Sequence, residues 1–258
     1  MSRQVVLVVM DGVGKSTTGL GDAVTAAHTP TLDKLLATCK NVYIKAHGTA
    51  VGLPSDEDMG NSEVGHNALG CGQVYSQGAK LVEEAIESGE IFNSSAWQEL
   101  KNNCVTHGSA MHFLGLLSDG NVHSNINHLI ALIKGAKRDG IKKVFVHVLL
   151  DGRDVPATSG LQYVDMLENA MAELNDESFT AKIASGGGRM TITMDRYFAN
   201  WDMVKRGFYT HVYGEGRGFE SATAAIETFR AETPGIIDQD LPAFVVVKDG
   251  KPVGAMHD

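Results

Sequence analysis

The stretch MHFLGLLSDGNVHSNINHLIALIKGAKRDGIKKVFVHVLL (residues 111–150) decides the fold class of this chain. It opens with an apolar run at 111–117, continues through a polar loop into an amphipathic segment at 125–137, and ends with a second apolar run at 144–150. Arg138-Asp139-Gly140 provides a helix stop before the second run. Strand, helix and strand in this order and at this length predict a crossover that joins two parallel strands.

The same alternation of short apolar runs and helical patterns extends along the rest of the chain. Further strands are predicted at 5–10, 42–45, 181–184 and 244–247, and further helices at 31–39, 79–88, 160–174, 195–205 and 221–230. Uninterrupted apolar strands separated by helices indicate an α/β fold with a parallel sheet covered on both faces. The glycine-dense stretch 60–78 is the best candidate boundary between a small N-terminal part, 1–78, and a larger α/β unit, 79–258.

Composition limits the classes of function. The net charge of −9 argues against nucleic acid or an anionic membrane as the main partner. The three cysteines match neither a disulfide framework nor a metal-binding pattern, which favours free thiols in a reducing compartment. The apolar run at 5–10 is too short for a signal sequence or a membrane span, so we interpret it as a buried strand. A cytoplasmic protein without a membrane partner is expected.

The most informative motif is Met-Gly-Asn-Ser-Glu-Val-Gly-His at 59–66. Ser62 stands between glycines, just before a run at 63–69 that can start a helix. A hydroxyl in that place lies beside free backbone N–H groups and the positive end of a helix dipole, which favours a phosphate, and such a serine can be a covalent nucleophile. The alternative is that Ser62 is only a helix N-cap. These eight residues alone favour that alternative.

Asp11 closes the first predicted strand. Because ligands gather at the carboxyl ends of parallel strands, this carboxylate is either a ligand for a hard metal ion or a turn-forming residue in Asp-Gly. Gly14-Lys15-Ser16-Thr17 resembles the end of a nucleotide-binding P-loop. The glycine required five positions before Gly14 is Val9, inside the predicted strand, so ATP binding is rejected.

Two loops follow the two strands of the central crossover. His123 lies in the loop after the first strand and can donate to an anion or act as an acid or base, although a loop histidine is often simply solvated. Arg153 and Asp154 follow the second strand; the arginine supplies a planar fork for a phosphate or carboxylate, and the aspartate can accept from a hydroxyl. If the strands are adjacent, both loops open into one crevice.

A third loop carries two more arginines. Ser185-Gly186-Gly187-Gly188 precedes Arg189, and a run of glycines permits close backbone approach to an anion. Arg196, near the start of a predicted helix, can join Arg189 on the same ligand; the alternative is a flexible loop with solvated arginines. Three arginines and a histidine at successive strand ends suit a small ligand with several negative charges.

Together these motifs resemble the N-terminal part of the cofactor-independent (2,3-bisphosphoglycerate-independent) phosphoglycerate mutase family. The matching segments run in the family's order over nearly the whole chain: Met-Asp-Gly-Val-Gly (10–14), Gly-Thr-Ala-Val-Gly-Leu-Pro (48–54), Met-Gly-Asn-Ser-Glu-Val-Gly-His (59–66), Leu-Leu-Ser-Asp-Gly-Asn-Val-His-Ser (116–124), Asp-Gly-Arg-Asp (151–154), Gly-Gly-Arg through Met-Asp-Arg (187–196) and Tyr-Gly-Glu-Gly (213–216).

The resemblance implies a two-domain enzyme that interconverts 3-phosphoglycerate and 2-phosphoglycerate. An alkaline-phosphatase-like domain would hold the serine and two divalent metal ions, Mn²⁺ first, with Mg²⁺ or Co²⁺ as alternatives and no need of 2,3-bisphosphoglycerate. An inserted α/β domain would hold the substrate, and residues 79–258 would form most of it. By position, Ser62 would be the phosphorylated nucleophile and a metal ligand, and Asp11 a second metal ligand. The residues that would bind the substrate are His123, Arg153, Asp154, Arg189 and Arg196.

The chain departs from that family in length. Family members are substantially longer, and their Arg-x-Asp-Arg substrate motif and remaining metal ligands have no counterpart in residues 1–258. Two other readings therefore stay open: a fragment that folds and at most binds phosphoglycerate, and another phosphohydrolase with an alkaline-phosphatase-like fold. A monomer with a small-molecule substrate is expected.

Overall fold

The computed structural model describes residues 4–10, 13–14, 16–194 and 200–256. They fall into two units, Met1–Lys45 and Ala46–Asp258. The predicted boundary at 78/79 lies inside the second unit and stays a prediction. Among the described residues, no helix is long and apolar enough to cross a membrane.

The first unit holds two short helices, α1 (Ala23–Ala26) and α2 (Pro30–Thr38). The second matches the helix predicted at 31–39 to within one residue. The strands predicted at 5–10 and 42–45 are wrong, since neither segment belongs to a strand and both are exposed. A strand needs a neighbour for its backbone N–H and C=O groups, and none of the described residues of this unit supplies one.

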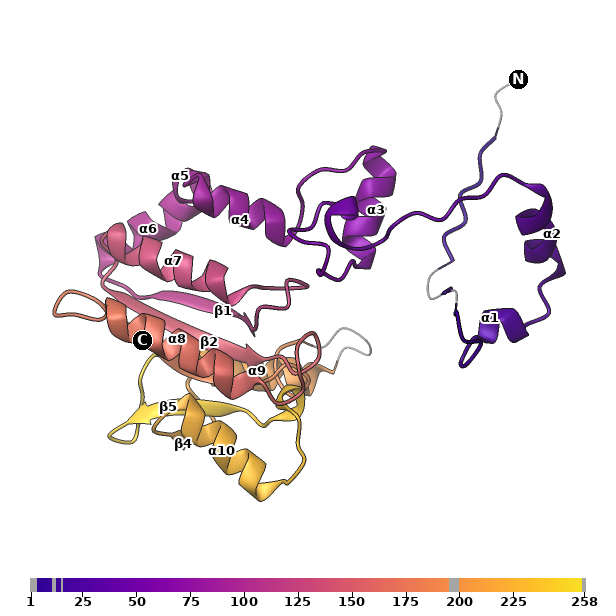
Figure 1. The fold of residues 1–258 in the computed structure, drawn as a ribbon. Helices are drawn as coiled ribbons and strands as arrows, with labels where there is room; N and C mark the ends of the chain where they lie inside the picture. Colours follow the sequence, from indigo (N-terminus) through magenta and orange to yellow (C-terminus); the bar gives the residue numbers. More distant parts are fainter. Residues whose placement is uncertain (1–3, 11–12, 15, 195–199, 257–258) are drawn as a thin grey trace. The chain divides into compact units, whose positions relative to one another are not determined.

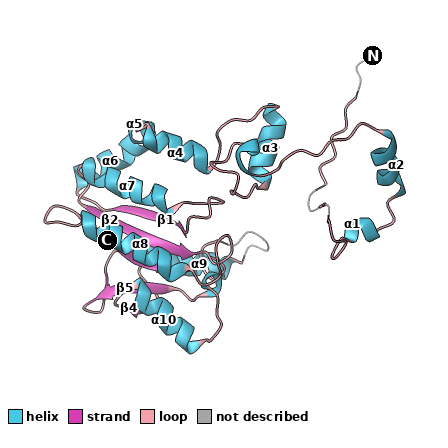
Figure 2. Ribbon diagram, in the orientation of Figure 1, coloured by secondary structure: helices cyan, strands magenta, loops and turns pink. Residues whose placement is uncertain are grey.

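The second unit is built on a sheet of strand order β1-β2-β3-β5-β4 (Figures 1 and 2). Its strands are β1 (Met111–Leu117), β2 (Lys143–Leu150), β3 (Thr180–Gly188), β4 (Arg217–Phe219), β5 (Phe244–Lys248) and β6 (Lys251–Pro252). The first three are mutually parallel, and β4 is parallel to β5. Antiparallel pairing joins β5 to β3 and β6 to β5. The predicted α/β class with a largely parallel sheet is confirmed.

The described part of the second unit also contains α-helices and short 3-10 helices. They are η1 (Gly48–Val51), α3 (Ser62–Cys71), α4 (Ala79–Glu87), α5 (Glu90–Asn93), α6 (Ser95–His107), α7 (Ile126–Arg138), α8 (Gly160–Leu174), α9 (Trp201–Val212), α10 (Ala222–Glu232) and η2 (Asp238–Asp240). The predicted helices at 125–137, 160–174 and 221–230 agree with the structure to within two residues. The helix predicted at 195–205 begins at Trp201 among the described residues, and α6 was not predicted.

The main core lies on the face of the sheet that α7, α8 and α10 cover. Alternate β2 residues Val144, Val146, Val148 and Leu150 point into it. The other β2 residues face α9, where Leu149 packs with Leu116 and Ile192. This alternation follows from the two-residue period of a strand, and it leaves the polar His147 on the α9 face.

The glycines at 186–188 do not form an anion-binding loop. They belong to β3 and allow the protein to approach itself: a Cβ on Gly186 would lie 2.6 Å from the Phe244 ring and 2.6 Å from the Val148 carbonyl oxygen. The prediction that these glycines permit a close approach is therefore correct, but the group that approaches them is the protein's own strand and ring and not an anion.

Replacing Gly186 by alanine is expected to destabilise the second unit. The added methyl must displace a strand backbone as well as a ring, and overpacking of this kind costs about 1–3 kcal/mol. Thermal unfolding should fall by roughly 3–10 °C. Gly115→Ala in β1 is the matched control, because a Cβ there meets nothing within 4 Å. Equal unfolding temperatures for the two variants would contradict the packing argument.

Candidate functional site

Ser62 is the first residue of α3, but it is not the helix cap. The cap is Asn61, whose side-chain oxygen accepts a hydrogen bond from the Val64 N–H at 3.1 Å. The interpretation of Ser62 as an N-cap is therefore wrong. Its exposed hydroxyl instead lies 3.1 Å from His66 Nδ1, one turn along the helix.

His66 is a neighbour of Ser62 to which sequence reasoning assigned no role. Its Nδ1 also lies 2.6 Å from the Ser62 carbonyl oxygen, which can only accept a hydrogen bond. The proton of a neutral ring is therefore on Nδ1, and Nε2 keeps the lone pair. In this arrangement Nδ1 cannot take the hydroxyl proton of Ser62. The four-residue spacing on one helix face was the available signal.

A small hydrophobic core packs α3 against η1 and the residues that follow it. Val51, Leu53 and Val64 pack together. The buried side-chain amide of Gln77 donates to the carbonyl oxygens of Val51 and Val64, at 2.8 and 3.0 Å. The Gln77 amide therefore links η1 to α3, and this link stabilises the position of the turn that contains Ser62.

Asp58 connects the segment before α3 to the loop after β1. Its carboxylate accepts from Asn121 Nδ2 at 2.6 Å and from the backbone and hydroxyl of Ser55. Burial alone would raise the pKa of Asp58, but these hydrogen bonds together lower it. Asp58 therefore links the segment before α3 to the loop that contains His123.

The three predicted loops begin at neighbouring strand ends. The pairing register sets Leu117 opposite Leu150, and Leu150 opposite Gly188. His123 follows the first of these ends, Arg153 and Asp154 the second, and Arg189 the third. The parallel arrangement of β1, β2 and β3 is what brings these loops to one edge of the sheet.

A buried ion cluster orders this edge. Arg189 Nη1 lies 2.8 Å from Asp151 Oδ1 and 2.7 Å from Asp154 Oδ2, and the Arg189 and Asp151 side chains are 7% and 2% exposed. Asp151 also accepts from Ser118 Oγ at 2.7 Å. Burial alone would raise the pKa of Asp151 and lower that of Arg189, but their hydrogen bonds reverse both directions. Asp151 was not among the predicted site residues, yet it holds one of them.

One cavity gathers the predicted residues. Its volume is ≈ 470 Å³, and its lining includes Ser62, His123, Arg153, Asp154 and Arg189. Met190 and Met194 complete one wall. Asp11 and Arg196 lie outside the described residues. Loops that are far apart in the sequence thus meet at one hollow, as the strand-end argument predicts.

The cavity provides donor groups for an anion. Arg153 and His123 are exposed and line the hollow, and in the described parts of the chain neither side chain makes an ion pair. Two carboxylates already contact Arg189, so Arg153 is the better candidate to meet a negative ligand first. The described residues contain no group of three or more His, Cys, Asp or Glu side chains that could hold a metal ion.

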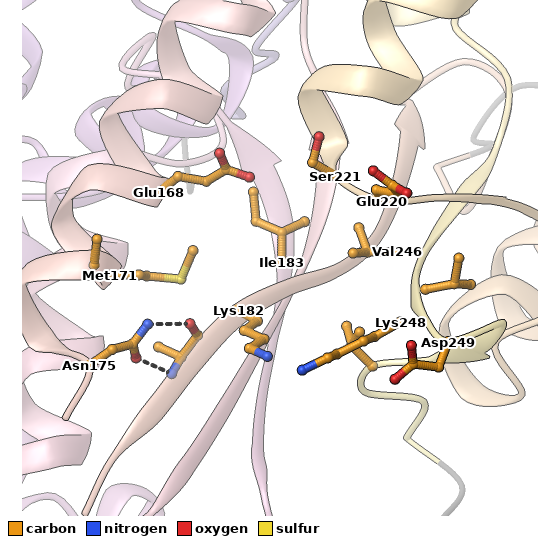
Figure 3. A pocket seen from close by; sticks show the side chains of 14 residues that line it. Glu168, Met171, Asn175, Lys182, Ile183, Glu220, Ser221, Val246, Lys248 and Asp249 are labelled. Atoms are coloured by element: carbon orange, nitrogen blue, oxygen red, sulfur yellow. Dashed lines mark hydrogen bonds between the residues drawn. The ribbon is translucent and has the colours of Figure 1, made fainter. Parts of the chain in front are cut away.

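A second cavity, ≈ 500 Å³, lies between α8, β3 and β5 (Figure 3). Its lining combines the apolar side chains of Met171, Ile183 and Val246 with the charged side chains of Glu168, Lys182 and Lys248. Asn175 closes one side through two hydrogen bonds to the Ala181 backbone. None of the predicted site residues contributes to it.

Known proteins resemble this chain along its length. The family described as BPG-independent PGAM N-terminus matches residues 82–258. A probable 2,3-bisphosphoglycerate-independent phosphoglycerate mutase of Leptospira interrogans is 54% identical over 100% of this chain and 47% of its own length. The corresponding mutase of Trypanosoma brucei brucei is 50% identical over 99% of this chain and 47% of its own length.

A solved structure has the same fold. It is a crystal structure of Leishmania mexicana phosphoglycerate mutase at low cobalt concentration, with a TM-score of 0.86 and 49% identity. The match covers 97% of this chain and 46% of that one. This chain thus spans about half the length of the curated relatives it matches, 47% for the two mutases above.

Proposed function

Because the chain belongs to the BPG-independent phosphoglycerate mutase family, whose N-terminal region it matches, we propose that its cavity binds a phosphoglycerate. One observation carries the proposal: Ser62, His123, Arg153, Asp154 and Arg189 line a single hollow. In the complete protein, this site would interconvert 3-phosphoglycerate and 2-phosphoglycerate through a phosphoserine at Ser62. Residues 1–78 would belong to a phosphatase-like domain and 79–258 to the inserted substrate domain.

The roles follow from the chemistry of the side chains. The Arg153 fork pairs with the phosphate or carboxylate of the ligand, and His123 donates an N–H to the same anion. Asp151 and Asp154 hold Arg189 in place, so the ligand meets an ordered donor. Asp154 accepts from a ligand hydroxyl with its remaining lone pairs. Arg196 would add a further positive charge.

In the proposed exchange, Ser62 Oγ first accepts the phosphoryl group and then returns it. The bond between phosphorus and the C3 oxygen breaks as a bond to Ser62 Oγ forms, and the serine proton passes to the glycerate. The glycerate then turns within the arginines, and its C2 oxygen takes the phosphoryl group back while Ser62 regains a proton. Water must stay out between the two steps, since it would convert the exchange into hydrolysis.

The metal ions belong to the proposal for the complete protein. Asp11 and Ser62 would be two ligands of a pair of divalent ions, Mn²⁺ first, with Mg²⁺ or Co²⁺ as alternatives. The described residues offer no complete ligand set for these ions. That the protein is a cytoplasmic monomer without nucleic-acid or membrane partners is part of the same proposal.

The incomplete set of metal ligands among the described residues favours a second function for the 258-residue chain. Without a complete ligand set among the described residues, the 258-residue chain taken alone would bind a phosphoglycerate and leave its phosphoryl group in place. Binding and exchange are therefore separate properties, and each needs its own measurement.

Replacing Arg153 by glutamine tests the binding role. A hydrogen bond to a charged group contributes about 1.5–3 kcal/mol, so the Kd for 3-phosphoglycerate should rise roughly ten- to hundredfold in calorimetric titration. Arg138→Gln is the matched control, since that exposed arginine is the last residue of α7 and pairs with Asp139, and neither residue lines the cavity. Equal affinities for the two variants would exclude Arg153 from the site.

A further inference from the structure

A chain of hydrogen-bonded side chains crosses the sheet on its α9 face. His112 Nδ1 lies 2.9 Å from His147 Nε2, and His147 Nδ1 lies 2.7 Å from Ser185 Oγ. Ser185 Oγ continues to His211 Nδ1 at 2.8 Å. His211 Nε2 then lies 3.2 Å from Thr193 Oγ1. We call these five residues the histidine chain; the proposed roles above use none of them.

The middle of the histidine chain is buried and uncharged. His147, Ser185 and His211 are 0%, 1% and 2% exposed. Burial, together with the neighbouring imidazoles His211 and His112, lowers the pKa of His147 to about 3, and burial lowers that of His211 to about 4. Both rings are therefore neutral at pH 7. A neutral imidazole has one donor and one acceptor nitrogen, and each of the four nitrogens has a partner.

Each neutral ring in the chain must donate on one side and accept on the other. The hydrogen bonds can all point from His112 toward Thr193 or all point the opposite way, or both rings can donate to Ser185 Oγ, which has two acceptor lone pairs. The hydroxyls of Ser185 and Thr193 fit each of these arrangements. An apolar side chain at either end of this series leaves a buried ring nitrogen without a partner, so the identity of the terminal residue matters.

The histidine chain ends on a strained residue. Thr193 has a φ of +72°, a left-handed conformation that a β-branched residue rarely adopts. Helix α9 approaches it so closely that a Cβ on Gly207 would lie 2.3 Å from Thr193 Oγ1. The Thr193 N–H points to the Met203 carbonyl oxygen of the same helix at 3.4 Å. Helix α9 thus holds the turn in a conformation that its own sequence does not favour.

The strained residue belongs to the turn that forms one wall of the candidate site. Arg189, Met190 and Met194 line the cavity, and Thr193 directly precedes the last of these. Arg206 of α9 donates to the Thr191 carbonyl oxygen at 3.0 Å, a second link from this helix to the turn. The position of the wall therefore depends on how α9 holds residues 191–193.

We propose that Thr193, held by His211 and Ser185, is a positioning residue that fixes the 189–194 turn in the shape that receives an anionic ligand. Its hydroxyl completes the histidine chain, and the completed chain keeps the left-handed turn from relaxing. The nature of the ligand, a phosphoglycerate, rests on the proposed function, whereas the link between Thr193 and the cavity wall does not.

The test compares Thr193→Val with Thr193→Ser in the 258-residue chain. Valine keeps the β-branched shape and loses the hydroxyl, and serine keeps the hydroxyl. The ¹³C-methyl NMR signals of Met190 and Met194, assigned by leucine substitution, report the position of the wall. Titration with 3-phosphoglycerate reports the site. Thr228→Val is the matched control, because that hydroxyl donates within α10, to the Ala224 carbonyl oxygen.

The valine variant is expected to shift both methyl signals and to raise the Kd about tenfold, while the serine and Thr228 variants behave like the unchanged chain. Unchanged methyl signals and affinity in Thr193→Val would overturn the proposal. So would an equal loss in Thr193→Ser or Thr228→Val, since the hydroxyl at 193 would then not be the cause.

Two further outcomes keep the inferences apart. If the unchanged chain binds no 3-phosphoglycerate, the proposed function of this chain fails, and the methyl signals alone decide the role of Thr193. If Thr193→Val does not fold, Thr193→Ala takes its place, because alanine lacks the hydroxyl and is smaller, while its Cβ leaves the left-handed conformation strained. The same shift in the methyl signals is expected from it, and its absence overturns the proposal.

Discussion

Replacing Ser62 by alanine is expected to abolish exchange between 3-phosphoglycerate and 2-phosphoglycerate in the full-length protein. The side chain is exposed at the start of α3, lines the cavity and is not used to cap the helix. Removing a covalent nucleophile leaves no acceptor for the phosphoryl group, so the rate should fall by roughly four orders of magnitude or more. A coupled assay that detects 2-phosphoglycerate measures this rate.

Binding and exchange should separate in this variant. Because the arginines remain, the Kd of Ser62→Ala for 3-phosphoglycerate should stay within about threefold of the unchanged protein, a change of under ~1 kcal/mol. Ser88→Ala, an exposed serine at the end of α4, is the control for the substitution itself. The 258-residue chain, assayed in parallel, is expected to show no exchange. Exchange by Ser62→Ala within tenfold of normal would exclude the phosphoserine.

Mild acid is expected to unfold the second unit. His147 and His211 have pKa values of about 3 and about 4 in the folded protein, against 6.5 in the unfolded chain. Between pH 6.5 and 4 the unfolded chain therefore binds more protons, so the free energy of unfolding falls as the pH falls. Two protons give a slope of up to ~3 kcal/mol per pH unit. Urea unfolding at half-unit pH steps measures it.

A substitution of His211 tests whether the buried histidines cause the pH dependence of the free energy of unfolding. His211→Gln keeps a donor and an acceptor beside Ser185 and Thr193 but cannot be protonated, so the slope between pH 6.5 and 4 should fall by about half. The stability of the variant at pH 7 serves as the reference, because both rings are neutral there. An unchanged slope would show that other groups cause the acid sensitivity.

The sequence predicted the elements that have a clear local pattern of apolar residues. β1, α7 and β2 follow from uninterrupted apolar runs and one amphipathic pattern, and both faces of β2 are covered. His123, Arg153 and Arg189 could be placed together because parallel strands end at one edge. These predictions depend on local pattern and on one topological rule, and both are readable without coordinates.

Other features depend on contacts between distant segments. His147 reaches Ser185 because the pairing of β2 with β3 shifts between Val146 and His147, which no pattern in either strand indicates. Asp151 was missed because its partner Arg189 lies 38 residues away. Residues 5–10 have the composition of a strand, but a strand also needs a neighbour, and composition does not reveal whether one is present.

The unpaired run at 5–10 has a consequence for the behaviour of the chain in solution. Val5, Val6 and Leu7 are 90%, 84% and 78% exposed, and the hexapeptide contains neither a charge nor a proline. Segments of this composition join other copies of themselves into cross-β stacks, in which identical side chains interdigitate. Concentrating the 258-residue chain is therefore expected to favour intermolecular strand pairing through these six residues.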